Sequence, residues 1–230
     1  MQLSRRLQAL ADMVSKNHIL ADVGCDHGYI PIFLLQNHRI PKAIAMDIGE
    51  GPLKRAQENI IANGLEGYIE TRLSDGLERL VPGEAQTILI SGMGGPLMEG
   101  ILSRGQHVLE EGTELILQPQ SDIPHFRMFL NEMEYKIIQE DLIFEDGKFY
   151  PMMKAVRGKE HYTPLEYRYG PRLLESKSLT LEKYLKREQR TLEEICDNLQ
   201  NQPGTKAKER CKELERELEF PREALRLYEL

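Results

Sequence analysis

The sequence lacks the marks of a secreted, membrane-spanning or disulfide-stabilised protein. No apolar run approaches the ~18 residues that a membrane span requires. Charged and polar residues interrupt residues 1–6, so we expect no signal peptide. The chain has only three cysteines (Cys25, Cys196 and Cys211), without the spacing of metal ligands or of a disulfide framework. These absences predict a cytoplasmic protein that binds neither a membrane nor a metal.

An excess of positive charge is also absent. The 230 residues include 37 acidic and 30 basic side chains, a net charge of −7. Residues 1–157 hold 22 acidic and 15 basic side chains, whereas residues 158–230 hold 15 of each. An acidic chain is not an obvious nucleic-acid binder, so any RNA contact would depend on local basic patches. The length allows one large domain, or one domain with an appendage.

The most informative feature that is present is a glycine-containing turn after the first predicted strand. Residues 19–31 read ILADVGCDHGYIP. The apolar start predicts a buried strand of a parallel sheet that ends at Asp22. Gly24 and Gly28 allow a sharp turn before a helix predicted over residues 29–36. Strand, glycine turn and helix are how doubly wound α/β folds build a site for a nucleotide-like ligand.

Asp26 stands where the dinucleotide-binding pattern G-x-G-x-x-G has its middle glycine. A carboxylate there would repel a pyrophosphate, whereas it would tolerate a cationic or zwitterionic ligand. S-adenosylmethionine carries a sulfonium and an ammonium, so the charge pattern favours it over NAD. Taken alone, this stretch is also compatible with a tight turn that binds no ligand.

The rest of the first 157 residues alternates between predicted strands and helices. Because parallel strands need crossover helices, the alternation predicts an α/β fold with a mostly parallel sheet. A hairpin around Asp146 and Gly147 would add an antiparallel end. We expect strands over residues 42–47, 68–73, 86–90, 114–117, 135–145 and 148–157, and helices over residues 2–16, 49–62, 96–109 and 123–132.

Acidic residues and glycines follow the predicted strands. Asp47 lies 25 residues after Asp22, where nucleotide-binding folds place a ribose-binding acid, although it also suits a helix cap. Asp75 and Gly76 follow the third strand. Three glycines in residues 92–95 predict a loop with exposed backbone groups after the fourth. Since strands of such sheets end at one edge, these groups should converge on a ligand site.

The last seventy residues predict a different structure. Two apolar series with heptad spacing indicate an antiparallel helical hairpin, a small coiled coil, with a turn at residues 203–205. We therefore divide the chain into domains 1–160 and 161–230, with a connector over residues 161–169. Basic residues of the hairpin would either form a solvated face or hold a tRNA backbone. The series are Leu181, Leu185, Leu192, Ile195 and Leu199, broken by Glu188, and Ala207, Cys211, Leu214, Leu218, Leu225 and Tyr228, broken by Pro221.

In combination, these motifs resemble the class I S-adenosylmethionine-dependent methyltransferases, and among them the bacterial tRNA (adenine(22)-N1)-methyltransferase family. The runs that carry the resemblance are DVGCDHGYIP at 22–31, ISGMGG at 90–95 and LQPQ at 117–120, together with the helical tail. The resemblance implies a Rossmann-like seven-stranded methyltransferase sheet and S-adenosyl-L-methionine as cofactor. It also implies methyl transfer to N1 of adenine 22 in the tRNA D-arm. Adenine-N6 methyltransferases carry Asn/Asp-Pro-Pro-aromatic where this chain has SGMGG, which argues against N6 chemistry.

The resemblance also implies roles for individual residues. Asp26 is the catalytic candidate, because N1 methylation makes the base cationic and a nearby carboxylate would stabilise that charge. For His27, a structural role in the turn is as compatible with the sequence as contact with the cofactor or the base. The side chain of Cys25 is expected to pack in the protein and not to react. The expected cofactor-binding residues are Asp22, Gly24, Cys25, His27, Gly28, Asp47, Ile48, Asp75, Gly76, Gly92 and Met93, and those expected to bind the extruded base and tRNA are Tyr29, Gly94, Gly95, Pro119, Arg5 and Arg6.

Two other functions remain open at this stage. The chain could be a methyltransferase of proteins or small molecules whose coiled coil makes dimers, which the acidic charge favours. It could also be a non-catalytic binding module whose coiled coil recruits a partner. With tRNA as the partner, we expect a monomer.

Overall fold

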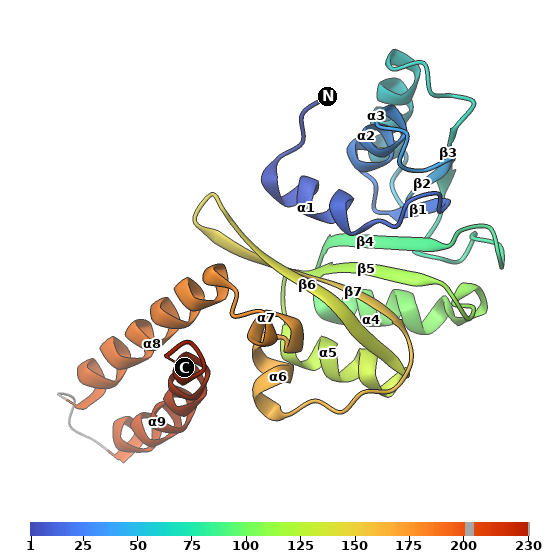
Figure 1. Cartoon of the computed structure of the whole chain (residues 1–230). Coiled ribbons are helices and arrows are strands. Elements are labelled where there is room, and N and C mark those ends of the chain that lie inside the picture. The colour runs from blue at the N-terminus through green and yellow to red at the C-terminus, as the bar shows by residue number, and fades with distance from the viewer. Residues whose placement is uncertain (201–204, 230) are drawn as a thin grey trace. The chain divides into compact units, whose positions relative to one another are not determined.

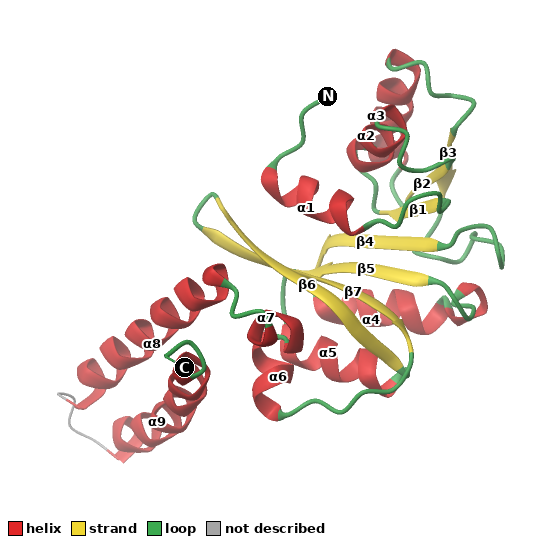
Figure 2. Cartoon of the chain, in the orientation of Figure 1, coloured by secondary structure: helices red, strands yellow, loops and turns green. Residues whose placement is uncertain are grey.

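The computed structural model describes residues 1–200 and 205–229. The chain divides into two compact units, Met1–His161 and Tyr162–Leu230. Figure 2 shows that strands belong to the first unit and that the second is helical. Within the described residues, no helix has the length and apolarity to cross a membrane, and no cluster of His, Cys, Asp or Glu could hold a metal ion.

The first unit is built around a seven-stranded sheet with strand order β3-β2-β1-β4-β5-β7-β6 (Figure 1). Strands β1 to β5 pair in parallel, whereas β7 runs antiparallel to both β5 and β6. This arrangement confirms the predicted Rossmann-like sheet with an antiparallel end. The strands are β1 (Leu20–Val23), β2 (Ala43–Asp47), β3 (Ile69–Leu73), β4 (Thr87–Met93), β5 (Glu114–Pro119), β6 (Tyr135–Glu145) and β7 (Lys148–Arg157).

Helices cover both faces of this sheet. Figure 1 shows α1, α2 and α3 on one face and α4 and α5 on the other. The predicted helix over residues 96–109 is shorter than expected, because α4 ends before Gly105. A Cβ at Gly105 would lie 2.4 Å from Leu77 Cδ1, so only glycine fits where the chain leaves the helix. The helices are α1 (Arg5–Met13), α2 (Tyr29–Gln36), α3 (Glu50–Ala62), α4 (Gly95–Arg104), the 3₁₀ turn η1 (Gln106–Val108) and α5 (Ile123–Glu132).

A buried ion pair fixes α1 to the sheet, at the amino ends of β4 and β5. Glu114 accepts hydrogen bonds from Lys154 Nζ (2.7 Å), Thr87 Oγ1 (2.7 Å) and Ser15 Oγ (2.7 Å). Burial by itself would raise the pKa of Glu114, but these hydrogen bonds hold it below its ordinary value. Lys154 Nζ also donates to the carbonyl of Met13, the last residue of α1, at 3.0 Å. This network holds the C-terminal end of α1 at the amino ends of these strands, so the N-terminal end of α1 extends toward their carboxyl ends.

The second unit consists of four described helices. Part of the expected connector over residues 161–169 is helical, because Thr163 and Glu166 form a capping box and Pro164 opens the first turn. Helices α8 and α9 pack side by side and form the predicted hairpin. Residues 203 and 204 of its expected turn lie outside the described residues. The helices are α6 (Pro164–Tyr169), α7 (Pro171–Glu175), α8 (Leu179–Gln200) and α9 (Thr205–Arg226).

The seam of this hairpin differs from the predicted one at residue 195. Ile195 is 41% exposed, and Cys196 is buried in its place, in a cluster with Leu192, Cys211 and Leu214. At the predicted break in the heptads, the Glu188 carboxylate accepts hydrogen bonds from Tyr169 Oη (2.6 Å) and Arg168 Nη2 (3.1 Å) of α6.

Candidate active site

A cavity of about 380 Å³ opens at the carboxyl ends of the central parallel strands. It lies where the strand order reverses between β1 and β4, the point at which open α/β sheets bind ligands. Its wall combines the turn after β1, the end of β4 and the N-terminal half of α1. The lining residues are Arg6, Leu7, Asp22, Gly24, Cys25, Asp26, His27, Tyr29, Ile30, Ser91, Gly92 and Gln120.

Asp22 is the buried charge of this cavity. Only 4% of the residue is exposed, and no described residue donates a hydrogen bond to its carboxylate. Burial, and after it the nearby Asp47, raises the pKa of Asp22 to about 7. A carboxylate buried without a partner is costly, and a bound cation would remove that cost. The side chain therefore fits a ligand with a positive group.

The turn after β1 is held by its backbone. Gly24 N and Cys25 N both donate to the carbonyl of Met46, at 2.8 and 3.0 Å. Gly24 has φ +76°, a backbone conformation that is strained for any residue with a side chain, and a Cβ there would also displace the end of the Met93 side chain, 2.4 Å away. Cys25 is buried, and burial followed by Asp22 and Asp47 raises the pKa of its thiol. The thiol is therefore protonated and unreactive, which agrees with a packing role.

Asp26 lies on the cavity wall with its carboxylate held from one side. Its φ of +43° lies in the left-handed region, which Asp tolerates better than most residues and which explains how it replaces glycine here. Arg55 Nη2 of α3 lies 2.8 Å from Asp26 Oδ1, and His27 Nε2 lies 3.5 Å from Oδ2. The His27 ring stacks on Tyr29, with centroids 5.0 Å apart. The turn thus presents an oriented carboxylate beside a flat aromatic surface.

Strands β2 and β3 continue the same edge beyond the cavity wall. Asp47 Oδ1 accepts from Gly49 N at 2.9 Å, within the turn before α3. Gly49 is the N-cap of α3 and no described side chain caps this helix, so the helix-cap interpretation of Asp47 was wrong. Ile48 directly after it is 69% exposed, an apolar surface open to a ligand. Ser74 N donates to the Asp47 carbonyl at 2.9 Å, which brings Asp75 to the same edge. A Cβ at Gly76, which follows it, would lie 2.9 Å from Ile101 Cγ2, so this glycine also serves packing.

The glycine-rich stretch after β4 is not the loop that the sequence predicted. Strand β4 continues through Gly92 to Met93, with a bulge where it pairs with Gln118 and Pro119, and α4 begins at Gly95. Some of the backbone groups expected to be exposed have partners. Met93 O accepts from Gln120 N at 2.9 Å, and Gly95 N donates to Ser121 O at 3.2 Å. A bulge gives a glycine with positive φ a place inside a strand, which local propensity cannot reveal.

Helix α1 contributes an arginine whose orientation is fixed. Arg6 Nη1 donates to Gln118 Oε1 at 3.1 Å, and the guanidinium lies 5.3 Å from the centroid of the Tyr150 ring. Arg5 does not line the cavity; its backbone N donates to Glu145 at 2.9 Å. Met93, Gly94, Gly95 and Pro119 also do not line the cavity.

Four residues that line the cavity were not among the predicted site residues: Leu7, Ile30, Ser91 and Gln120. Ser91 and Gln120 belong to the SGMGG and LQPQ runs, so their motifs gave a signal. Leu7 and Ile30 gave no signal in the sequence, because apolar residues in a predicted helix are expected to contact the core before a ligand.

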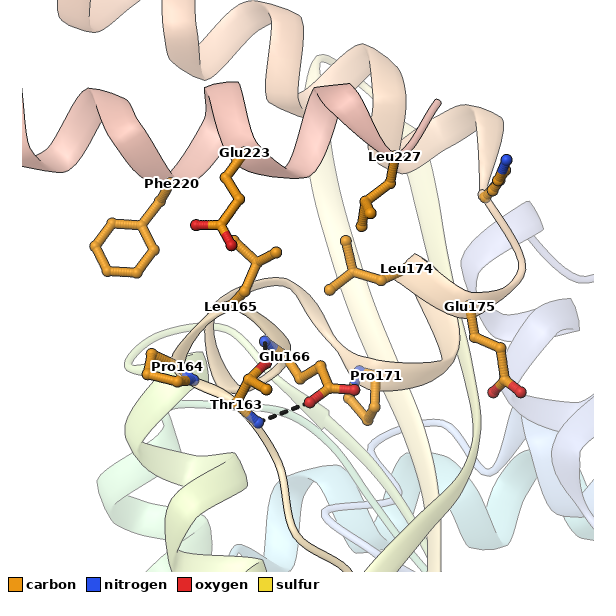
Figure 3. A pocket seen from close by; sticks show the side chains of 11 residues that line it. Thr163, Pro164, Leu165, Glu166, Pro171, Leu174, Glu175, Phe220, Glu223 and Leu227 are labelled. Carbon is orange, nitrogen blue, oxygen red and sulfur yellow. Dashed lines mark hydrogen bonds between the residues drawn. The ribbon is translucent and has the colours of Figure 1, made fainter. Parts of the chain in front are cut away.

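A larger cavity in the second unit has a different character (Figure 3). It measures about 830 Å³, and its lining includes Leu165, Leu174, Phe220 and Leu227. Glu166 lies at this cavity, but its carboxylate accepts from Thr163 N at 2.7 Å and so serves the capping box. The lining contains no strand end and no glycine turn. We therefore place the active site at the sheet edge of the first unit, where those features occur.

The sheet order, the antiparallel β7 and the acidic glycine turn at the switch point define a Rossmann-like methyltransferase. The family model described as "Methyltransferase domain" matches residues 3–153. A curated relative, the tRNA (adenine(22)-N(1))-methyltransferase of Bacillus subtilis, is 39% identical over 158 residues. That alignment spans 69% of this chain and 66% of the relative.

Solved structures extend this similarity to nearly the whole chain. The B. subtilis m1A22 tRNA methyltransferase TrmK superposes with a TM-score of 0.85 and 33% identity over 97% of this chain and 98% of that one. TrmK of M. capricolum, solved with S-adenosyl-homocysteine, gives a TM-score of 0.84 and 27% identity over 99% of both chains. The chain belongs to the tRNA (adenine(22)-N(1))-methyltransferase family, TrmK. Of the three functions considered from the sequence, this membership favours the first.

Proposed function

We propose that this protein transfers a methyl group from S-adenosyl-L-methionine to N1 of adenine 22 in tRNA. The observation that carries the proposal is the cavity at the β1–β4 switch point, where a buried, unpartnered carboxylate stands among glycine turns in a chain of the TrmK family. The acidic first unit agrees with a cationic cofactor, which the carboxylates of Asp22 and Asp47 would attract.

The residues at the sheet edge fit this cofactor along its length. The Asp47 carboxylate would hold the ribose hydroxyls, the exposed Ile48 would pack on the adenine ring, and Asp75 with Gly76 would border it. Asp22 would face the cationic methionine end. The other residues that would surround that end are Gly24, Cys25, His27, Gly28, Gly92 and Met93. When bound, S-adenosylmethionine supplies a sulfonium methyl, which the in-plane lone pair of adenine N1 takes while the C–S bonding electrons return to sulfur.

The chain's own groups would align the target base and stabilise its new charge. Adenine N1 needs no deprotonation before attack, so positioning is the main requirement. Tyr29 offers an aromatic face on which an extruded base would stack. Asp26 would stabilise the positive charge that develops on the base. Arg6 would approach the tRNA backbone from α1, with Arg5, Gly94, Gly95 and Pro119 at the approach to the cavity.

The second unit would hold the body of the tRNA. Its hairpin carries exposed lysines on both helices, among them Lys183, Lys206, Lys208 and Lys212. Acidic residues alternate with them, so we expect contacts with phosphates that fix register without reading sequence. We propose the sequence-based division, 1–160 and 161–230, as a division of labour between catalysis and tRNA binding. The proposal extends to a cytoplasmic monomer.

The test is methyl transfer from labelled S-adenosylmethionine to unmodified tRNA transcripts, with product nucleosides identified by mass. We expect 1-methyladenosine at one D-arm position, lost when adenine 22 is replaced by uridine. Label at another adenine, or label as N6-methyladenosine, would contradict the proposal. Absence of label on any tRNA, with S-adenosylmethionine bound, would point to a protein or small-molecule substrate.

A further inference from the structure

The side-chain amide of Gln120 lies on the cavity wall and forms no hydrogen bond with any described residue. Its backbone is fixed where β5 ends, because Gln120 N donates to Met93 O at 2.9 Å. Its amide lies over the end of β4: Nε2 is 3.9 Å from the point where a Cβ of Gly92 would lie. The residue is exposed and lines the cavity, and no described residue forms a hydrogen bond with its side chain. It is thus a donor and acceptor held at the substrate side of the site.

The other glutamine beside Pro119 is used differently. Gln118 is fully buried, accepts from Arg6 Nη1 at 3.1 Å and donates to the Pro119 carbonyl at 3.3 Å. One glutamine of the pair therefore orients Arg6, and the other presents its amide to the cavity. Ser91 also lines the cavity, but a hydroxyl can either donate or accept and so does not distinguish one purine from another.

Methylation at N1 restricts how the enzyme can recognise adenine. The Watson–Crick edge must face the methyl donor, so a protein group that bound N1 would block the reaction. The neighbouring Hoogsteen edge offers the N6 amino group as a donor and N7 as an acceptor. A glutamine amide matches this pair with two hydrogen bonds, whereas guanine presents O6 and N7, two acceptors.

We propose that Gln120 is the residue that selects adenine, by accepting from N6–H and donating to N7 of the extruded base. This inference deepens the proposed function and rests on it. Recognition from the β5 side would turn N1 toward the β1 side of the cavity, where Asp22 and Asp26 lie. Gln120 would then set both which base enters and which nitrogen faces the methyl group.

The test compares wild-type enzyme, Gln120→Ala and the matched control Gln139→Ala, whose exposed side chain lies on β6 away from the cavity. Each is assayed on tRNA carrying either adenosine or 7-deazaadenosine at position 22. We expect Gln120→Ala to lower kcat/KM on adenosine by about 5- to 150-fold, the value of one bidentate contact. We expect wild type and Gln139→Ala to lose up to about tenfold on the 7-deaza base, which lacks the N7 acceptor. Gln120→Ala should lose less than wild type on the 7-deaza base, because this variant has no hydrogen bond to N7 to lose.

Comparison between variants isolates the contact. Any effect of 7-deaza substitution on the basicity of N1 is common to all variants and cancels in the ratio. The affinity for S-adenosylmethionine, measured by calorimetry, should stay within about twofold in Gln120→Ala, which excludes a collapsed site. Equal sensitivity to N7 in wild type and Gln120→Ala would overturn the inference alone. A wild type that methylates no adenine 22 would instead overturn the proposed function, and the inference with it.

Discussion

The two halves of the sheet edge carry opposite kinds of chemistry. On one side of the switch point, the carboxyl ends of β1 and β2 and the turns after β1 and β3 form a carboxylate half, with Asp22, Asp26, Asp47 and Asp75. On the other side, the ends of β4 and β5 form an amide half, with the neutral side chains Ser91, Gln118 and Gln120. We infer that the first half suits a cationic ligand and the second an uncharged heterocycle. Under the proposed function, this difference in charge would separate the cofactor from the target base.

Replacement of Asp26 should have the largest effect. It tests whether a carboxylate of the carboxylate half acts on a base bound at the amide half. Asp26→Asn keeps a residue that tolerates the left-handed backbone and removes the charge. We expect single-turnover methyl transfer at saturating S-adenosylmethionine to slow by about 100- to 1000-fold, because the base loses its counter-charge.

The control for this variant is Arg55→Gln, which releases the Asp26 carboxylate without removing it. We expect this variant to keep the rate within about fivefold, because the ion pair is exposed and contributes little. A rate for Asp26→Asn above half the wild-type value would show that the assigned role is wrong.

The second effect tests the carboxylate half by itself. Asp22→Asn should weaken S-adenosylmethionine binding by about 100-fold, because a charge-assisted contact in a buried site is lost. Titration calorimetry measures this, with Asp146→Asn in the β6–β7 turn as the matched control. Equal affinities for wild type and Asp22→Asn would remove Asp22 from the site.

The same variant should stabilise the ligand-free protein. The folded-state pKa of Asp22, about 7, lies above its ordinary 3.8, so the folded chain holds this proton more tightly than the unfolded chain. Its contribution to stability therefore falls as pH rises between about 4 and 7. At pH 8 we expect a higher Tm for ligand-free Asp22→Asn than for wild type, and a lower Tm once S-adenosylmethionine is added.

The third effect tests what holds the amide half together. A Cβ at Gly95 would lie 2.7 Å from the carbonyl oxygen of Ser121, a backbone atom that cannot move aside cheaply. We expect Gly95→Ala to lower the free energy of unfolding by about 1–3 kcal/mol, measured by urea denaturation. Gly67→Ala, where a Cβ meets open space, is the control and should change stability by less than about 0.5 kcal/mol. Equal midpoints would show that the β4–α4 turn adapts.

The halves also differ in how far the sequence could predict them. Asp22, Asp47 and Asp75 follow predicted strands, and the parallel fold alone brings such positions to one edge. In the amide half, Gly92 and Met93 read as a loop because glycine favours turns, yet pairing with β5 draws them into the sheet. That pairing is a tertiary contact between residues distant in sequence, which local pattern does not contain.

The side chains of the amide half were harder still to assign. Gln118 and Gln120 are the same residue type, two positions apart, and one is fully buried while the other faces the cavity. Gln118 lies within β5 and contacts Arg6 of α1, whereas Gln120 follows the end of the strand. The second unit repeats the lesson, since Tyr169 and Arg168 satisfy Glu188 from helix α6 and Cys196 replaces Ile195 in the seam.

The last prediction is a pH dependence of the Kd of S-adenosylmethionine, which tests whether the carboxylate half binds a cationic ligand. Below about pH 7 the Asp22 carboxylate becomes protonated in the ligand-free site, and a cation must displace that proton to bind. We expect the Kd of S-adenosylmethionine to rise by up to tenfold per unit as pH falls from 7 to 5.5. An α-amino group titrates near 8, so the ligand's ammonium stays charged across that range.

Two controls identify the source of this pH dependence. Asp22→Asn should bind S-adenosylmethionine with the same Kd from pH 7 to 5.5, because its amide does not titrate. Methylthioadenosine keeps the nucleoside and lacks both cationic groups, so its Kd for the wild-type enzyme should also stay constant. A rise in Kd for the neutral nucleoside would assign the proton to a group other than Asp22, and the separation of charge between the two halves would no longer account for how the cofactor is held.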